Sequence, residues 1–189
     1  MQQTPSQTVG PFFAFGLLKK GENVLVSDAT KGERIRIEGR VLDGEGQPMP
    51  DAMIEIWQAN GYGRYNHPED KQEKPLDPSF KGFGRAGTDQ NGVYWFETIK
   101  PGSVPGPDNS VQAPHLNVIV FARGMLLHAF TRIYFEGEAA NKSDPVLSRV
   151  EDQGRRATLI ARREESGGKI LYRFDIRLQG ENETVFFDI

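Results

Sequence analysis

Residues 34–57, with the sequence RIRIEGRVLDGEGQPMPDAMIEIW, indicate how this chain folds. In the first half, Ile, Ile, Gly and Val at odd positions alternate with charged residues at even positions. A period of two is typical of a strand with one face buried and the other in water. Residues 43–46, DGEG, are turn formers, and residues 52–57 are a second apolar segment. The stretch therefore predicts two strands separated by a turn.

Similar segments recur along the chain. Further strands are expected at residues 93–98, 115–123, 126–135 and 170–178, with a last one at 183–188. The 21 glycines and 12 prolines leave little room for long helices, and only residues 144–163 favour short helical pieces. The pattern predicts an all-β domain with many turns.

Segments without a period surround these strands. Residues 58–88 and 101–114 are long loops, which in a compact domain are usually functional or covered by a partner. Residues 1–33 are expected to form an N-terminal arm packing on a partner subunit, and residues 34–189 the β domain. Phe12, Phe13 and Phe15 favour a packed arm, because three exposed aromatic rings are unfavourable in water. The alternative is a loose terminus.

Composition excludes several classes of function. The 189 residues predict one domain with a substantial core. A net charge of −3 and a pI near 5.7 argue against nucleic acid or an anionic membrane as partner. The absence of cysteine excludes disulfides, thiolate nucleophiles and iron–sulfur clusters. The apolar run at residues 11–18 is too short to span a bilayer, and its charges follow it, so a cytoplasmic protein is expected.

Metal chemistry has few residues to draw on. The chain has three histidines and no HExxH or His-x-His motif. His115 begins an apolar segment, and strand parity places Asn117 on the same face. His-x-Asn offers only one imidazole, and an amide is a poor ligand for a ferric or zinc ion. From the residues alone, His115 is a hydrogen-bonded histidine at a strand end.

The order of motifs nevertheless resembles a known family. The matching stretches are TPSQTVGPFF (4–13), IEIWQANGYGRY (54–65), PLDPSFKGFGR (75–85), GTDQNGVYWFETIKPG (87–102), APHLNVIVFARG (113–124), RIYFEGE (132–138) and YRFDI…GENETVFFD (172–188). They resemble the intradiol ring-cleaving dioxygenases, in particular the α-type subunit of members built from two homologous subunits. The resemblance implies an immunoglobulin-like or prealbumin-like β-sandwich and a homologous β subunit in an (αβ)n assembly. It also implies protocatechuate and O2 as substrates in aromatic catabolism, with 3-carboxy-cis,cis-muconate as product on the β-ketoadipate pathway.

Departures from the family pattern concern the metal. The iron-bearing members hold Fe(III) with two Tyr and two His, and their pattern ends in Arg-Pro-Ala-His-x-His. The corresponding positions here are Gln72, Val104, His115 and Asn117, and Gln112 stands in place of the arginine. One imidazole with neutral groups cannot hold Fe(III), a hard ion that needs phenolate or carboxylate charge. The chain is therefore expected to bind no metal, with the Fe(III) in its β partner.

The resemblance also implies a substrate-binding role without catalytic residues. Thr8, Gly10, Pro11 and Phe12 match the family's arm beside the partner's active site, and Arg123 matches an arginine near the substrate. A fixed arginine suits the ring carboxylate of protocatechuate. Two alternatives remain: a non-catalytic β-sandwich that acts as a carrier or interaction module, and a stand-alone catechol dioxygenase. The replaced ligands speak against the second.

Overall fold

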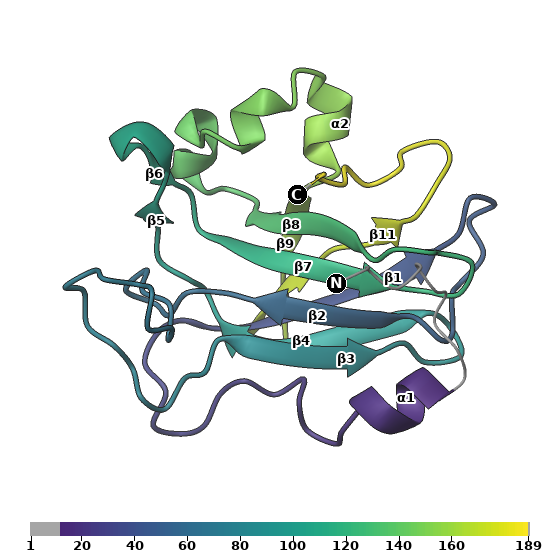
Figure 1. Ribbon diagram of the computed structural model, residues 1–189, viewed down its shortest axis with the longest axis horizontal. Helices are drawn as coiled ribbons and strands as arrows, with labels where there is room; N and C mark the ends of the chain where they lie inside the picture. The colour runs from purple at the N-terminus through teal and green to yellow at the C-terminus, as the bar shows by residue number, and fades with distance from the viewer. Residues whose placement is uncertain (1–11, 189) are drawn as a thin grey trace, which may run out of the picture.

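The computed structural model describes residues 12–188, which fold around one large sheet (Figure 1). The sheet has nine strands in the order β11-β1-β10-β9-β8-β7-β2-β3, with β4 paired to β1. Its strands are β1 (Arg34–Leu42), β2 (Met53–Trp57), β3 (Phe83–Gly87), β4 (Val93–Ile99), β7 (His115–Phe121), β8 (Ala129–Phe135), β9 (Ile160–Ser166), β10 (Lys169–Arg173) and β11 (Ile176–Arg177). A separate two-stranded sheet joins β5 (Val104–Pro105) to β6 (Val111–Gln112). The all-β expectation is confirmed.

The large sheet curls into a barrel-like shape. Strand β4 runs antiparallel to β1, with Arg34 opposite Ile99, and β1 runs parallel to β10, with Ile35 opposite Ile170. At the other end β2 lies between β3 and β7, antiparallel to both. Strand β3 packs close to β4, so the two ends of the sheet approach each other (Figure 1). The immunoglobulin-like or prealbumin-like sandwich stays a prediction.

The alternation in β1 determines which side chains enter the core. Ile35, Ile37, Gly39 and Val41 are buried, whereas the charged residues between them are exposed or half-buried. Their side chains meet those of β2, β4, β7 and β8 in the main hydrophobic cluster. A smaller cluster lies under the short helices and contains Tyr134, Leu147 and Leu159. These helices are η2 (Ala139–Ser143), η3 (Leu147–Arg149) and α2 (Gln153–Ala157), and a further turn, η1 (Pro107–Asn109), precedes β6.

The sequence pattern misses two strands of the large sheet, besides the short β5 and β6. Strand β3 lies within the segment expected to be a loop, because Gly84 and Gly87 interrupt its pattern. Their lack of a side chain is needed: a Cβ would lie 2.5 Å from Leu25 Cδ1 and 2.6 Å from Leu18 Cδ1, respectively. Strand β9 begins inside the segment expected to be helical. Its residues are extended because they pair with β10 across a tight Gly167-Gly168 turn, in which both φ angles are positive. The expected strand at 183–188 is reduced to a single bridge between Phe187 and Phe130.

The described part of the N-terminal segment follows the sheet. After α1 (Phe12–Leu17), the backbone of residues 22–25 bonds to Arg85 and Glu97, with N–O distances of 2.9 to 3.0 Å. The side chain of Leu25 is buried against the core. Packing of the arm on a partner, and the domain boundary at residue 33, stay predictions.

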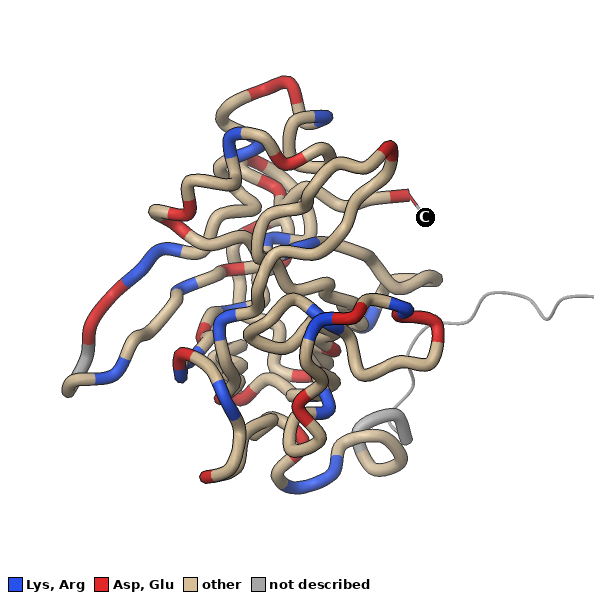
Figure 2. The backbone as a smooth tube through the Cα atoms, turned by 90° about the vertical axis from the view of Figure 1, so that its left-hand side faces the viewer, with Lys and Arg blue, Asp and Glu red and all other residues tan. Residues whose placement is uncertain are grey.

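Charged side chains are spread over the described surface. Figure 2 shows basic and acidic residues interspersed along the backbone, and the β9–β10 hairpin carries both kinds. Within residues 12–188, no helix is long and apolar enough to cross a membrane.

Candidate functional site

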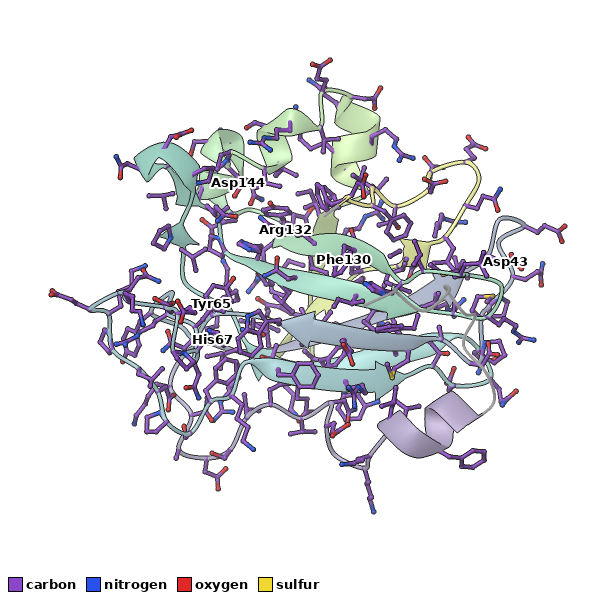
Figure 3. The ribbon with its side chains drawn as sticks, viewed as in Figure 1. Asp43, Tyr65, His67, Phe130, Arg132 and Asp144 are labelled. Carbon is purple, nitrogen blue, oxygen red and sulfur yellow. The ribbon has the colours of Figure 1, made fainter. Side chains whose placement is uncertain are left out.

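A pocket of about 640 Å³ lies where β2 ends and β7 begins. Figure 3 shows Tyr65 and His67 on the long loop beside this end of the sheet, with Arg132 and Asp144 nearer the short helices. The lining residues come from β2, the loop that follows it, the β5–β6 sheet, β7 and β8: Trp57, Tyr65, His67, Glu69, Asp70, Lys71, Gln72, Val104, Pro105, Gln112, His115 and Arg132. The fold thus brings together three of the four matched ligand positions: Gln72 and Val104, which are altered, and His115, which keeps the family's histidine.

Strands β7 and β8 form the floor of the pocket. Their antiparallel register places His115 opposite Tyr134 and Asn117 opposite Arg132. Residues two apart on a strand share a face, so these four side chains form one patch. The rings of His115 and Tyr134 lie 5.7 Å apart between centroids. The parity argument made from the sequence therefore holds for His115 and Asn117.

His115 is a neutral imidazole in this patch. Its side chain is buried, and its Nδ1 lies 2.7 Å from the carbonyl oxygen of Ala113. Burial, followed by the charge of Arg132, lowers the pKa of His115 to about 4. A carbonyl only accepts hydrogen bonds, so Nδ1 carries the proton and Nε2 carries the lone pair. This agrees with the hydrogen-bonded strand-end histidine expected from the residues alone.

Asp144 anchors the start of β7 from behind the pocket. This fully buried carboxylate accepts hydrogen bonds from the backbone N–H groups of Ala113 at 2.8 Å, Val146 at 2.9 Å and Leu147 at 2.7 Å. The hydroxyl of Tyr134 donates to it at 3.0 Å. Four donors satisfy a buried charge that would otherwise be strongly unfavourable. The sequence offered no signal for this role, because residue 144 lies 31 positions from residue 113.

Tyr65 and Trp57 form an aromatic wall of the pocket. Their rings stack with centroids 5.8 Å apart and planes 15° apart. The amide of Asn117 donates to the Tyr65 hydroxyl at 3.3 Å and to the Trp57 carbonyl at 3.4 Å. Burial raises the pKa of Tyr65 above its ordinary value, so its phenol stays protonated. Sequence reasoning missed Tyr65, whose only signal was an aromatic residue in a long polar loop.

Asp70 holds the loop that covers the pocket. One oxygen accepts from the backbone N–H of Tyr65 at 2.7 Å and from Gln72 Nε2 at 3.0 Å, and the other from the Gln72 backbone at 3.0 Å. Although burial opposes it, these hydrogen bonds lower the pKa of Asp70. Gln72 Nε2 also donates to the Gly63 carbonyl at 3.0 Å, so this side chain braces the loop.

The matched ligand positions do not fit a ferric ion. They offer the neutral imidazole of His115 and the amides of Gln72 and Asn117, while Val104 has no ligand atom in its side chain. Of the two carboxylates in the lining, Asp70 accepts hydrogen bonds within its own loop and Glu69 is exposed. Fe(III) requires anionic oxygen ligands. In the part of the chain that the structure describes, no three His, Asp or Glu side chains cluster as metal ligands would.

Arg123 lies away from the pocket. It follows β7 at the end opposite to His115, and the seven residues of β7 by themselves span roughly 20 Å. Its side chain is exposed and forms an ion pair with Asp51, Nε to Oδ1, at 3.0 Å. Thr8, Gly10 and Pro11 lie outside the described residues, and Phe12 begins α1. Among the described residues, therefore, the structure does not join the expected substrate residues to the pocket.

A family model described as "Dioxygenase" matches residues 9–180. The chain is 44% identical over 202 residues to the protocatechuate 3,4-dioxygenase alpha chain of Burkholderia cepacia, covering 100% of this chain and 98% of that one. It is 37% identical over 169 residues to the beta chain from the same organism, covering 86% and 72%. Hydroxyquinol 1,2-dioxygenase from Pseudomonas putida DLL-E4 shares the fold, with a TM-score of 0.66, 22% identity and coverage of 96% and 68%.

Proposed function

Because this chain belongs to the dioxygenase family matched by residues 9–180, we propose that it is the α subunit of a protocatechuate 3,4-dioxygenase. The observation that carries the proposal is full-length similarity to an alpha chain, combined with the lack of an anionic side chain at the matched ligand positions Gln72, Val104, His115 and Asn117. An enzyme of this family without its ligands needs a partner that holds the metal. The similarity to a beta chain of the same enzyme is consistent with such a homologous partner.

In this proposal the αβ complex adds both atoms of O2 to protocatechuate. The ring opens between the two hydroxyl-bearing carbons and gives 3-carboxy-cis,cis-muconate, so that all atoms of both substrates are retained. The Fe(III) belongs to the β subunit, and this chain holds none. The proposal places the enzyme in the cytoplasm, on the β-ketoadipate pathway of aromatic catabolism.

This chain contributes a cation and part of the wall to the active site of its partner. Arg123 is exposed at the end of β7, and its ion pair among residues 12–188 is with the exposed carboxylate of Asp51, so a partner's substrate can reach it. A guanidinium binds a carboxylate through two parallel hydrogen bonds, which suits the ring carboxylate of protocatechuate. We further propose that Thr8, Gly10, Pro11 and Phe12 of the N-terminal arm line the same partner site.

A non-catalytic carrier or interaction module is the second candidate. The observation in its favour is the pocket of about 640 Å³, a volume within the usual range for small-molecule sites. A carrier would act without an iron-bearing partner. Co-purification of an iron-containing chain of similar size would therefore support the α-subunit function and exclude the isolated carrier.

The test is to produce this chain alone and together with its β partner. We expect the chain alone to contain no stoichiometric iron and to leave protocatechuate intact, and the complex to contain iron and to consume protocatechuate and O2 in equal amounts. Substituting His115→Gln in the complex is a matched control, which should leave the iron content unchanged. Stoichiometric iron with ring cleavage in the chain alone would refute the proposal.

A further inference from the structure

Arg132 is a cation without an anionic partner in the pocket. It is half-buried on β8, and its Nη1 donates to Gln112 Oε1 at 2.7 Å and to the Tyr134 hydroxyl at 3.3 Å. Both acceptors are neutral, and within residues 12–188 its guanidinium takes part in none of the ion pairs. A half-buried charge without a counter-ion favours binding of an anion.

The nearby carboxylates are already occupied. Asp144 accepts four hydrogen bonds from backbone N–H groups and the Tyr134 hydroxyl, and Asp70 accepts three within its own loop. Glu69, the remaining acidic residue of the lining, is exposed. The positive charge of Arg132 is therefore directed into the pocket, where it contributes to the lowered pKa of His115.

The rest of the lining suits a flat apolar ring. The stacked pair Trp57–Tyr65 forms one wall, and Val104 and Pro105 contribute apolar surface from β5. His115 adds a hydrogen-bond acceptor, because Nδ1 donates to Ala113 and Nε2 retains its lone pair. Arg132 and His115 occupy diagonal positions on paired strands. The backbones of such diagonal residues lie roughly 7–8 Å apart. A small ring that bears an acidic group can reach from one to the other.

We propose that this pocket is a non-catalytic binding site for a small aromatic carboxylate, with the carboxylate on Arg132 and the ring against the Trp57–Tyr65 wall. A ring hydroxyl opposite the carboxylate would donate to His115 Nε2. The inference goes beyond the proposed function, because the pocket and Arg123 lie at opposite ends of β7. The αβ complex would then have two separate sites for aromatic acids, only one of which does chemistry.

Equilibrium dialysis with radiolabelled benzoate tests this site on the full chain in complex with its partner. Arg132→Gln removes the cation, and we expect it to weaken binding at one site per chain by about tenfold or more. Val104→Phe fills the pocket and keeps the arginine, and it should abolish the same site. Arg123→Gln is the matched control at the far end of β7, and it should leave this site intact.

Two results would overturn the inference. The first is an unchanged number of benzoate molecules bound per αβ unit, at unchanged affinity, in both the Arg132→Gln and Val104→Phe complexes, each shown by circular dichroism to be folded. The second is acetate competing as well as benzoate, which would mean that the ring contributes nothing. Failure of the α-subunit proposal looks different, because it would appear as stoichiometric iron and ring cleavage in the chain alone, whatever the benzoate site does.

Discussion

Replacing Arg123 with alanine should separate stability from activity. The guanidinium pairs with Asp51 at 3.0 Å, but its side chain is 59% exposed and that of Asp51 is 49% exposed. An ion pair in such a position contributes about 0.2–1 kcal/mol, because water and salt screen it. The unfolding free energy of the Arg123→Ala chain should therefore change by less than about 1 kcal/mol.

The effect on turnover should be much larger. Hydrogen bonds between charged partners contribute about 1.5–3 kcal/mol where water is excluded, as between a guanidinium and a bound carboxylate. Each 1.36 kcal/mol is a factor of ten, so kcat/KM for protocatechuate should fall by roughly 10- to 150-fold. Catechol lacks the carboxylate, and its slower turnover by the same complex should not depend on Arg123.

The assay measures O2 uptake by the αβ complex with both substrates and urea unfolding of the same preparations. Three variants serve as controls: Arg123→Lys keeps a charge, Asp51→Asn frees the arginine, and Arg162→Ala removes an exposed arginine elsewhere. Arg123→Lys should lose less activity than Arg123→Ala, and the other two should keep theirs. Equal losses toward protocatechuate and catechol, or no loss toward either, would refute the assignment of Arg123 to the substrate carboxylate.

Three further predictions concern the pocket itself. Asp144→Ala leaves four hydrogen-bond donors without their acceptor. The free energy of unfolding, measured in urea, should fall by at least about 3 kcal/mol. A loss under about 1 kcal/mol would show that Asp144 does not anchor the start of β7. The pKa of His115 is lowered to about 4 in the folded chain, whereas an unfolded histidine titrates near 6.5. As the pH falls from 6.5 to 4, only the unfolded chain gains this proton. The free energy of unfolding should therefore drop by up to roughly 3 kcal/mol over that range. Unfolding curves of His115→Gln should lack this part of the pH dependence, and identical slopes would contradict the expectation. Gly63→Ala, at a φ of +80°, places a Cβ 2.0 Å from the Ser103 carbonyl oxygen. Gly124→Ala has nearly the same φ, +78°, but no atom lies within 4 Å of its Cβ. Tm should therefore fall further for Gly63→Ala, and equal decreases would mean that only the φ angle matters.

Strands with a clear period could be predicted from the sequence. In β1 the side chains alternate because backbone geometry turns successive residues to opposite faces, and the buried residues follow that alternation. Strand β3 could not be predicted in this way. Gly84 and Gly87 are needed because the side chains of Leu25 and Leu18 pack against them. These leucines lie far earlier in the chain, so no local pattern indicates the contact.

Some features of the candidate site could likewise be predicted from the sequence, and others could not. The absence of anionic ligands at Gln72, Val104 and Asn117 could be seen in the sequence, because it depends only on residue type at matched positions. Tyr65 and Arg132 had no such signal. Their roles depend on neighbours from other strands, since Asn117 binds the hydroxyl of Tyr65 and Gln112 binds the guanidinium of Arg132.

The sequence by itself determined that this is an all-β chain whose family metal site has lost its charged ligands. Only the tertiary structure decided that the altered site remains an open pocket with a cation in it, and that Arg123 lies at the far end of β7. Residue type and strand parity are local properties, set by covalent geometry within a few residues. The pocket depends on contacts between distant residues, such as Asp144 with Ala113 and Asn117 with Tyr65, and such long-range hydrogen bonds form only when the chain has folded.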